Sequence, residues 1–257
     1  MSDTPDQYKA AAFFDLDGTL IKGSANIPFA ISAFKKGLVS KKQLLVDIKN
    51  GVSFKLKGAT DERSAEVRDR ILEAVKGQRV DDIVAIADDF MAKLVSQVQP
   101  EMAEVLAEQK AMGNARVILS ASPTEIVSRL AKELGLEYGI GTTAAHENGI
   151  YTGVLAGPFC YREGKAEIIR SMCAEHGWPL EDCYAYSDSL SDLPMMEVVG
   201  HPVAVNPETE LREKADEDGW PVVETSNIRS MRKRDMPKAA AKNMANKLHR
   251  SSEEAAG

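Results

Sequence analysis

Residues 10–19, AAAFFDLDGT, decide the fold. The first five of these residues are apolar and Asp15 follows them, which is typical of a buried strand that brings a carboxylate to its carboxyl end. Asp17 comes two residues later, so on extended backbone its side chain points the same way as that of Asp15. Gly18 then allows a sharp turn. The stretch therefore predicts two neighbouring carboxylates at one end of a buried strand.

Short apolar runs alternate with helical patterns along much of the remaining chain. This alternation predicts an α/β fold, with a parallel sheet covered by helices on both faces. Ser122 and Pro123 have the residue types of a helix N-cap followed by a first helical residue, and Gly113, Gly135 and Gly177 are expected to end helices. We expect strands at residues 10–16, 116–120, 183–188 and 201–206, and helices at residues 100–112, 123–134 and 164–176.

Two stretches interrupt the alternation. Residues 22–98 contain no good strand pattern and read as helices at 41–50, 62–76 and 80–97, which predicts a helical insertion. Residues 141–146 and 149–155 flank Glu147-Asn148-Gly149, a strong signal for a β-hairpin. We therefore expect a core made of residues 1–21 and 99–228, a helical cap at 22–98 and a separate tail at 229–257.

The composition excludes several classes of protein. The chain has 257 residues, 44% of them hydrophobic, three cysteines and a net charge of −7, as expected for a soluble globular protein. Three cysteines cannot form a disulfide scaffold and favour a reducing compartment, so we expect a cytoplasmic protein. There is no apolar run of membrane-spanning length and no signal-peptide pattern at the N-terminus. The acidic total disfavours a nucleic-acid partner.

The charge is unevenly distributed along the chain. Residues 229–257 contain eight Lys or Arg and three Asp or Glu, which leaves −12 on residues 1–228. One interpretation of this basic tail is an electrostatic contact with a membrane surface. The simpler interpretation, which we favour, is a solvated flexible tail. Vesicle sedimentation with and without the tail separates the two interpretations.

Four carboxylates lie at or just after the carboxyl ends of two expected strands. Asp15 and Asp17 lie at the end of the first, and Asp188 ends the strand at 183–188, with Asp192 four residues on. The carboxyl ends of parallel strands meet at one edge of a sheet, where ligands bind in open α/β folds. Close carboxylates repel each other and call for a cation, and hard oxygen ligands suit Mg²⁺. A carboxylate can also attack phosphorus while a second one moves protons.

Two further residues suit a phosphate group. Ser120 ends an expected strand just before a helix, where a hydroxyl and free backbone N–H groups can bind an anion. Lys165 lies at the start of the helix at 164–176 and can supply a positive charge. Taken alone, Ser120 could be an N-cap, Lys165 a surface lysine, and Asp15 with Asp17 a turn pair. Their joint occurrence in this order favours a phosphate site.

These motifs resemble the four ordered motifs of the haloacid dehalogenase-like phosphohydrolase superfamily. The resemblance covers residues 10–225, and the helical insertion is similar to the cap of the phosphoserine-phosphatase-like branch, subfamily IB. It implies a three-layer Rossmann-like core with an inserted α-helical cap, and a Mg²⁺-dependent phosphatase that forms an aspartyl-phosphate on a small phosphorylated metabolite. By the same resemblance, Asp15 is the nucleophile and Asp17 is the general acid and base. The resemblance implies a phosphate site formed by Ser120, Ala121 and Lys165. It also implies a metal site formed by Asp15, Asp17, Asp188 and Asp192.

Three departures from the phosphoserine phosphatases concern the substrate. Residues 22–26, KGSAN, lack the acidic residue that grips the substrate amine in those enzymes. Ser120 is followed by Ala121-Ser122 instead of two glycines, and Ser191 stands where those enzymes have Asn. Phosphoserine hydrolysis and transfer of the phosphoryl group to an alcohol therefore stay as alternatives to hydrolysis of another phosphomonoester.

Overall fold

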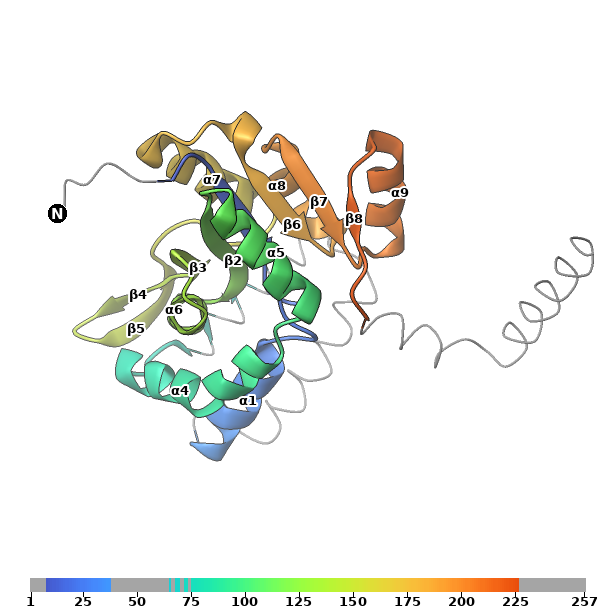
Figure 1. Ribbon diagram of the computed structural model, residues 1–257. Helices are drawn as coiled ribbons and strands as arrows, with labels where there is room; N and C mark the ends of the chain where they lie inside the picture. The colour runs from blue at the N-terminus through green and yellow to red at the C-terminus, as the bar shows by residue number, and fades with distance from the viewer. Residues whose placement is uncertain (1–7, 38–64, 66–67, 70–71, 74, 227–257) are drawn as a thin grey trace, which may run out of the picture.

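The computed structural model describes residues 8–37, 65, 68–69, 72–73 and 75–226 (Figure 1). Its centre is a six-stranded sheet with the order β3-β2-β1-β6-β7-β8, in which every pairing between neighbours is parallel. The expected α/β fold with a parallel sheet is confirmed. The strands are β1 (Ala11–Asp15), β2 (Ala115–Pro123), β3 (Tyr138–Thr142), β6 (Tyr184–Ser187), β7 (His201–Val205) and β8 (Val222–Val223).

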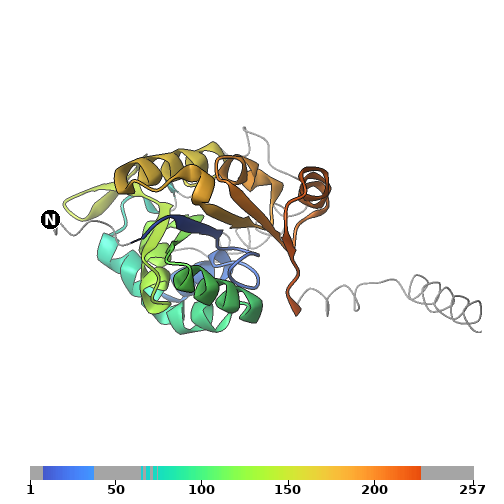
Figure 2. The same cartoon turned by 45° about the horizontal axis from the view of Figure 1, so that its top comes forward.

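Helices cover both faces of this sheet and complete three layers (Figure 2). Successive residues of β1 pack into different cores: Phe14 faces α5 and α6, whereas Phe13 faces α7, α8 and α9. Because side chains alternate along a strand, one apolar run supplies both cores. The helices are α5 (Pro100–Ala111), α6 (Thr124–Glu133), α7 (Glu163–His176), α8 (Leu193–Glu197) and α9 (Thr209–Asp218).

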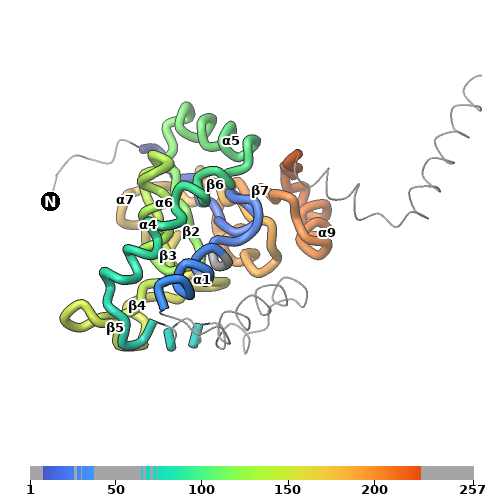
Figure 3. The backbone as a smooth tube through the Cα atoms, turned by 90° about the horizontal axis from the view of Figure 1, so that it is seen from below, coloured from blue at the N-terminus to red at the C-terminus, as the bar shows by residue number. Residues whose placement is uncertain are grey.

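Helices α1 (Asn26–Lys35) and α4 (Val80–Ser96) lie in the segment between β1 and α5. Helix α1 lies beside α4 (Figure 3). The rings of Phe29 and Phe90 join the two helices edge to face, with their centroids 6.4 Å apart. The chain enters and leaves this segment side by side, since Lys22 N–H donates to the Gln97 carbonyl at 2.8 Å. The expected helix at 41–50 and the tail at 229–257 lie outside the described residues, and the division into core and cap stays a prediction.

Two local expectations need correction. Strand β2 continues to Pro123, which pairs with Thr142 of β3 and has extended backbone angles (φ −53°, ψ 139°). Helix α6 therefore begins at Thr124, and Ser122 is not its N-cap. The expected strand at 141–146 is divided, because its first two residues belong to β3. Only β4 (Ala144–Glu147) pairs with β5 (Ile150–Leu155), in the expected antiparallel hairpin.

None of the helices in the described part of the chain has the length and hydropathy needed to cross a bilayer.

Candidate active site

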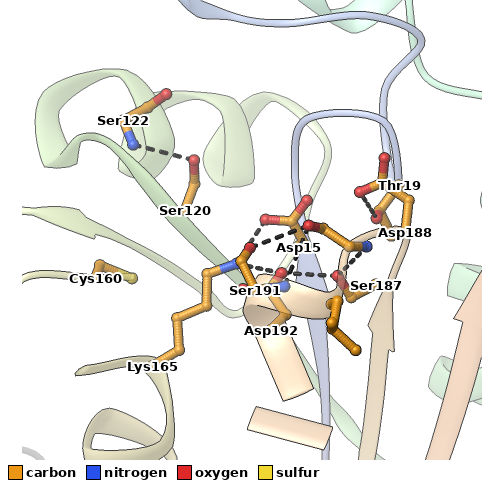
Figure 4. A network of polar contacts seen from close by, with 12 residues as sticks. Asp15, Thr19, Ser120, Ser122, Cys160, Lys165, Ser187, Asp188, Ser191 and Asp192 are labelled. Carbon is orange, nitrogen blue, oxygen red and sulfur yellow. Dashed lines mark hydrogen bonds and ion pairs between the residues drawn. The ribbon is translucent and has the colours of Figure 1, made fainter. Parts of the chain in front are cut away.

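The carboxyl edge of the sheet gathers the polar residues that the sequence singled out. Asp15 is the last residue of β1, Ser120 lies in the neighbouring β2, and Asp188 follows β6 on the other side. Lys165 reaches the same point from the first turn of α7 (Figure 4). Parallel strands end at a common edge, so residues far apart in the sequence meet there.

A buried lysine bridges two of the carboxylates. Lys165 Nζ donates to Asp15 Oδ1 at 2.6 Å and to Asp192 Oδ2 at 2.8 Å (Figure 4). Asp192 Oδ2 also accepts from the Ser187 hydroxyl at 2.7 Å. The side chains of Lys165 and Asp192 are only 2% and 3% exposed. One ammonium and two carboxyl groups are thus buried together, so the cluster has an excess of one negative charge when both carboxyl groups are ionised.

The pKa values in this cluster follow from its burial and its charges. Burial, together with the charge of Asp192, raises the pKa of Asp15 to about 7 against the opposing effect of Lys165. Burial by itself lowers the pKa of Lys165, but Asp15 and Asp192 together hold that pKa above its usual range. Lys165 therefore stays protonated at neutral pH, and an additional cation would relieve the excess negative charge.

Asp17 is bound to the segment that leads into α1. Its Oδ2 accepts from the Ser24 hydroxyl at 2.9 Å, and its Oδ1 accepts from the backbone N–H of Ala25 at 2.8 Å. Ala25 is the N-cap residue of α1. The carboxylate of Asp17 thus joins the loop after β1 to the start of α1.

Asp188 lies directly against the loop after β1. Gly18 has a φ of +94°, and a Cβ at this position would collide with the Asp188 carboxylate, so the loop requires glycine here. Thr19 Oγ1 donates to Asp188 Oδ1 at 3.2 Å (Figure 4). The absence of a side chain at Gly18 therefore lets the Asp188 carboxylate reach the backbone between Asp17 and Thr19.

The donors at this edge are oxygen atoms, which suit Mg²⁺. Within the described ranges, no three His, Cys, Asp or Glu side chains are grouped as a metal site. A metal held here would need a backbone carbonyl besides the carboxylates of Asp15 and Asp188. The carbonyl of Asp17 lies in the same loop, next to Gly18, which the Asp188 carboxylate contacts.

Ser120 and Ala121 occupy extended backbone near the end of β2. Ser120 is buried, and its Oγ accepts from the backbone N–H of Ser122 at 3.1 Å. The expectation that Ser120 ends its strand is wrong, because β2 continues to Pro123. Helix α6 begins at Thr124, one residue after its expected start. The role of Ser120 and Ala121 in binding phosphate stays a prediction.

Residues 12–197 match the family model for haloacid dehalogenase-like hydrolases. The chain belongs to this family. It is similar to a probable phosphatase of Mycobacterium tuberculosis, with 39% identity over 240 residues that cover 93% of this chain and 83% of the relative. Phosphoserine phosphatase SerB1 of the same species is 31% identical over 239 residues, covering 92% and 78%. A solved structure of a Bordetella pertussis protein of unknown function has a TM-score of 0.72 at 25% identity, covering 84% of this chain and 98% of that one.

Two residues near the site of this haloacid dehalogenase-like hydrolase carried no signal in the sequence. Cys160 is fully buried beside Lys165, and burial raises the pKa of its thiol to about 12, so it stays protonated and is a poor nucleophile (Figure 4). Glu208, just before α9, accepts from Leu190 N–H at 2.6 Å and from Ser189 Oγ at 3.1 Å. It thereby braces the loop between Asp188 and Asp192, and only the folded chain reveals these contacts.

Proposed function

We propose that this hydrolase cleaves phosphate monoesters of small metabolites through a phosphoryl group carried on Asp15. The observation that carries the proposal is the buried Lys165, which binds Asp15 and Asp192 at the carboxyl edge of the sheet. Burying an ammonium with two carboxylates is costly for the fold. Groups with strongly perturbed pKa values are concentrated at functional sites, which favours a role in catalysis. The phosphatase names of the two relatives support the same activity.

The reaction has two halves. In the first, an Asp15 oxygen forms a bond to phosphorus, the bond from phosphorus to the leaving oxygen breaks, and Asp17 gives that oxygen a proton. In the second, Asp17 takes a proton from water, the water oxygen bonds to phosphorus, and the bond between Asp15 and phosphorus breaks. Inorganic phosphate leaves, and both carboxyl groups return to their starting state.

Lys165 and Ser120 bind the phosphoryl oxygens in this proposal, together with the backbone N–H of Ala121. The ammonium of Lys165 offsets the negative charge of both Asp15 and the phosphate, which otherwise repel each other. Asp192 keeps Lys165 at the edge of the sheet through its 2.8 Å contact. These residues supply positioning and electrostatic stabilisation.

We infer a Mg²⁺ site from the oxygen donors. Asp15, Asp188 and the backbone carbonyl of Asp17 would hold the ion, with Asp192 bound directly or through water. The close approach of Asp188 to Gly18 fits this arrangement, since it brings the second carboxylate to the loop that carries the first. When bound, Mg²⁺ supplies positive charge that stabilises the charge developing on the phosphoryl oxygens.

The test is hydrolysis of an aryl phosphate with and without Mg²⁺. The wild type should release phosphate only with the ion, and Asp15→Asn should abolish turnover because the amide is a poor nucleophile. Asp182→Asn is the matched control: Asp182 is exposed, and this variant should keep the wild-type rate. Turnover of Asp15→Asn at the wild-type rate would contradict the proposal.

Phosphoserine is a second candidate substrate, because the similarity to SerB1 favours it. Residues 22–26 contain no acidic residue that could bind the substrate amine, which favours another phosphomonoester. A panel of phosphoserine, sugar phosphates and lysophosphatidate separates the two by kcat/KM. Adding alcohol acceptors to the same assay tests phosphoryl transfer, which would give a phosphorylated alcohol in place of inorganic phosphate.

A further inference from the structure

A buried polar network lies behind the loop that carries Asp15 and Asp17. Its central residue is Gln99, the N-cap residue of α5, which is 2% exposed. Two partners, Thr225 and Asn206, come from the C-terminal part of the chain and are 0% and 9% exposed. Buried polar side chains that are this far apart in the sequence require a specific set of hydrogen bonds.

The hydrogen bonds of Gln99 have a single consistent assignment. Its amide faces two carbonyl groups, so the nitrogen must point to them: Nε2 donates to Thr19 O at 2.6 Å and to Gly18 O at 3.3 Å. Its Oε1 accepts from the Thr225 hydroxyl at 2.6 Å. Gln99 is thereby bound on both sides.

Asn206 completes the network behind Thr225. The Thr225 hydroxyl gives its proton to Gln99 and accepts from Asn206 Nδ2 at 3.1 Å, while Thr225 N–H donates to Asn206 Oδ1 at 2.8 Å. Asn206 has a φ of +46°, a conformation that asparagine tolerates better than most residues. The amide of Gln99 therefore cannot turn without breaking bonds on the far side of the network.

The network fixes the direction of a peptide group that also contacts Asp15. The carbonyl of the peptide between Thr19 and Leu20 accepts from Gln99, and its N–H donates to the Asp15 carbonyl at 3.3 Å. Thr19 also binds the Asp188 carboxylate through its hydroxyl. Within the loop, Gly18 N–H donates to the Ile21 carbonyl at 3.1 Å and Ile21 N–H donates to the Leu16 carbonyl at 3.0 Å. Gln99 adds a restraint from outside the loop, at the carbonyl of Gly18, whose positive φ and missing side chain make it the most flexible residue there.

We propose that Gln99 is a positioning residue for the loop that carries Asp15 and Asp17, and that Thr225 and Asn206 hold Gln99 in place. The inference rests on the proposed function of Asp15. Gln99 acts through the backbone of Gly18 and Thr19 and touches no reacting atom. Its loss lets the loop rotate, so Asp15 and Asp188 no longer meet the phosphoryl group in a fixed geometry.

Gln109 is a matched control for Gln99. It also lies at α5, is 3% exposed, and makes two side-chain hydrogen bonds, to the Tyr186 hydroxyl at 2.9 Å and from Asn114 at 2.7 Å. These partners are not part of the loop after β1. Replacing either glutamine with methionine removes a buried amide that forms hydrogen bonds, and the two amides are buried to a similar extent. Both variants should therefore lose thermal stability to a comparable extent.

The experiment compares Gln99→Met with Gln109→Met in aryl-phosphate hydrolysis, well below the melting temperature of each. Gln99→Met should lower kcat by about tenfold with KM changed by less than about twofold, and Gln109→Met should keep the wild-type kcat. Thr225→Val should lower kcat in the same direction, and Thr225→Ser should restore it because the hydroxyl is retained. Equal kcat values for the two methionine variants would overturn the proposal.

Amide hydrogen exchange gives a second readout that needs no activity. Gln99→Met should speed exchange in peptides covering residues 16–21 and leave peptides from α7 unchanged, whereas Gln109→Met should leave both unchanged. Unchanged exchange at residues 16–21 in Gln99→Met would overturn the inference. If the wild type hydrolyses no phosphate ester, the proposed function fails, and the exchange measurement alone decides whether Gln99 holds the loop.

Discussion

The two ends of the parallel sheet each hold an ionic cluster, partly buried at the amino end and buried at the carboxyl end, and the two clusters differ in their balance of charge. At the amino end, Arg116 of β2 pairs with Glu137, which precedes β3. Arg116 Nη2 and Nε donate to the two oxygens of Glu137 at 2.8 and 3.0 Å, and its backbone N–H donates at 2.7 Å. At the carboxyl end, Lys165 lies between Asp15 and Asp192.

We interpret this difference as one between a structural cluster and a functional one. The planar guanidinium of Arg116 makes a bidentate contact with one carboxylate, and the two charges cancel. Lys165 meets two carboxylates and leaves one negative charge without compensation, at the edge where parallel sheets bind ligands. We expect the first cluster to contribute to stability alone and the second to contribute to catalysis.

The largest effect is expected for Lys165→Met. This variant should lower kcat by on the order of a thousandfold, because the phosphoryl oxygens and Asp15 lose their common positive charge. Arg116→Met is the counterpart at the other end and should lower the melting temperature while keeping kcat at temperatures where it is folded. A loss of kcat in folded Arg116→Met as large as in Lys165→Met would break the comparison.

A smaller effect, on stability alone, is expected for Glu137→Gln. Burial by itself raises the pKa of Glu137, but the hydrogen bonds and charge of Arg116 outweigh it and bring the pKa below its ordinary value of 4.5. A carboxyl group whose pKa is lower in the folded than in the unfolded state stabilises the fold at pH values above its unfolded-state pKa. This contribution is lost as the pH falls through the folded-state pKa.

Urea unfolding of wild type and Glu137→Gln measures this contribution. The wild type should be more stable at neutral pH by about 1–2 kcal/mol, and the difference should shrink at pH values below 4.5. A difference that stays constant over that range would show that the charge of Glu137 contributes nothing.

The smallest effect is expected for Glu208, which braces the loop between Asp188 and Asp192 from the exposed side. Glu208→Ala removes the acceptor of Leu190 N–H and should lower kcat about threefold, whereas Glu208→Gln keeps an acceptor oxygen and should stay near the wild type. Equal kcat values for the two variants, measured at saturating Mg²⁺, would show that the hydrogen bonds of Glu208 do not support the loop between Asp188 and Asp192.

Local patterns in the sequence predicted much of the fold and site. Asp15 follows an apolar run and lies at the carboxyl edge of the sheet, as expected. Asn148 and Gly149 form the expected turn of the β4–β5 hairpin, and both have positive φ angles. Strand β3 escaped prediction because Gly139 and Gly141 weaken its pattern. A Cβ at either glycine would collide with the chain around α6, so the packing that requires glycine also hides the strand.

Contacts between distant residues could not be predicted in the same way. Gln99 lies 80 residues from Thr19 and 126 from Thr225, and nothing local to Gln99 marks it as a partner of the loop after β1. The pairing of Lys165 with Asp15 also spans 150 residues. The sequence indicated Asp15 and Lys165 as candidate site residues because one lies at the end of an expected strand and the other at the start of an expected helix. Their contact depends on the order of strands in the sheet.

The most direct test of the central claim is to search for the phosphoryl group on the chain during turnover. Wild-type enzyme is mixed with an aryl phosphate and Mg²⁺, quenched in acid, digested with pepsin at low pH, where an acyl phosphate survives, and analysed by mass spectrometry. We expect a phosphoryl group on Asp15, in a peptide that contains this residue, and none in Asp15→Asn. Turnover without any phosphorylated chain, or with the phosphoryl group on another residue such as Ser120, would contradict it.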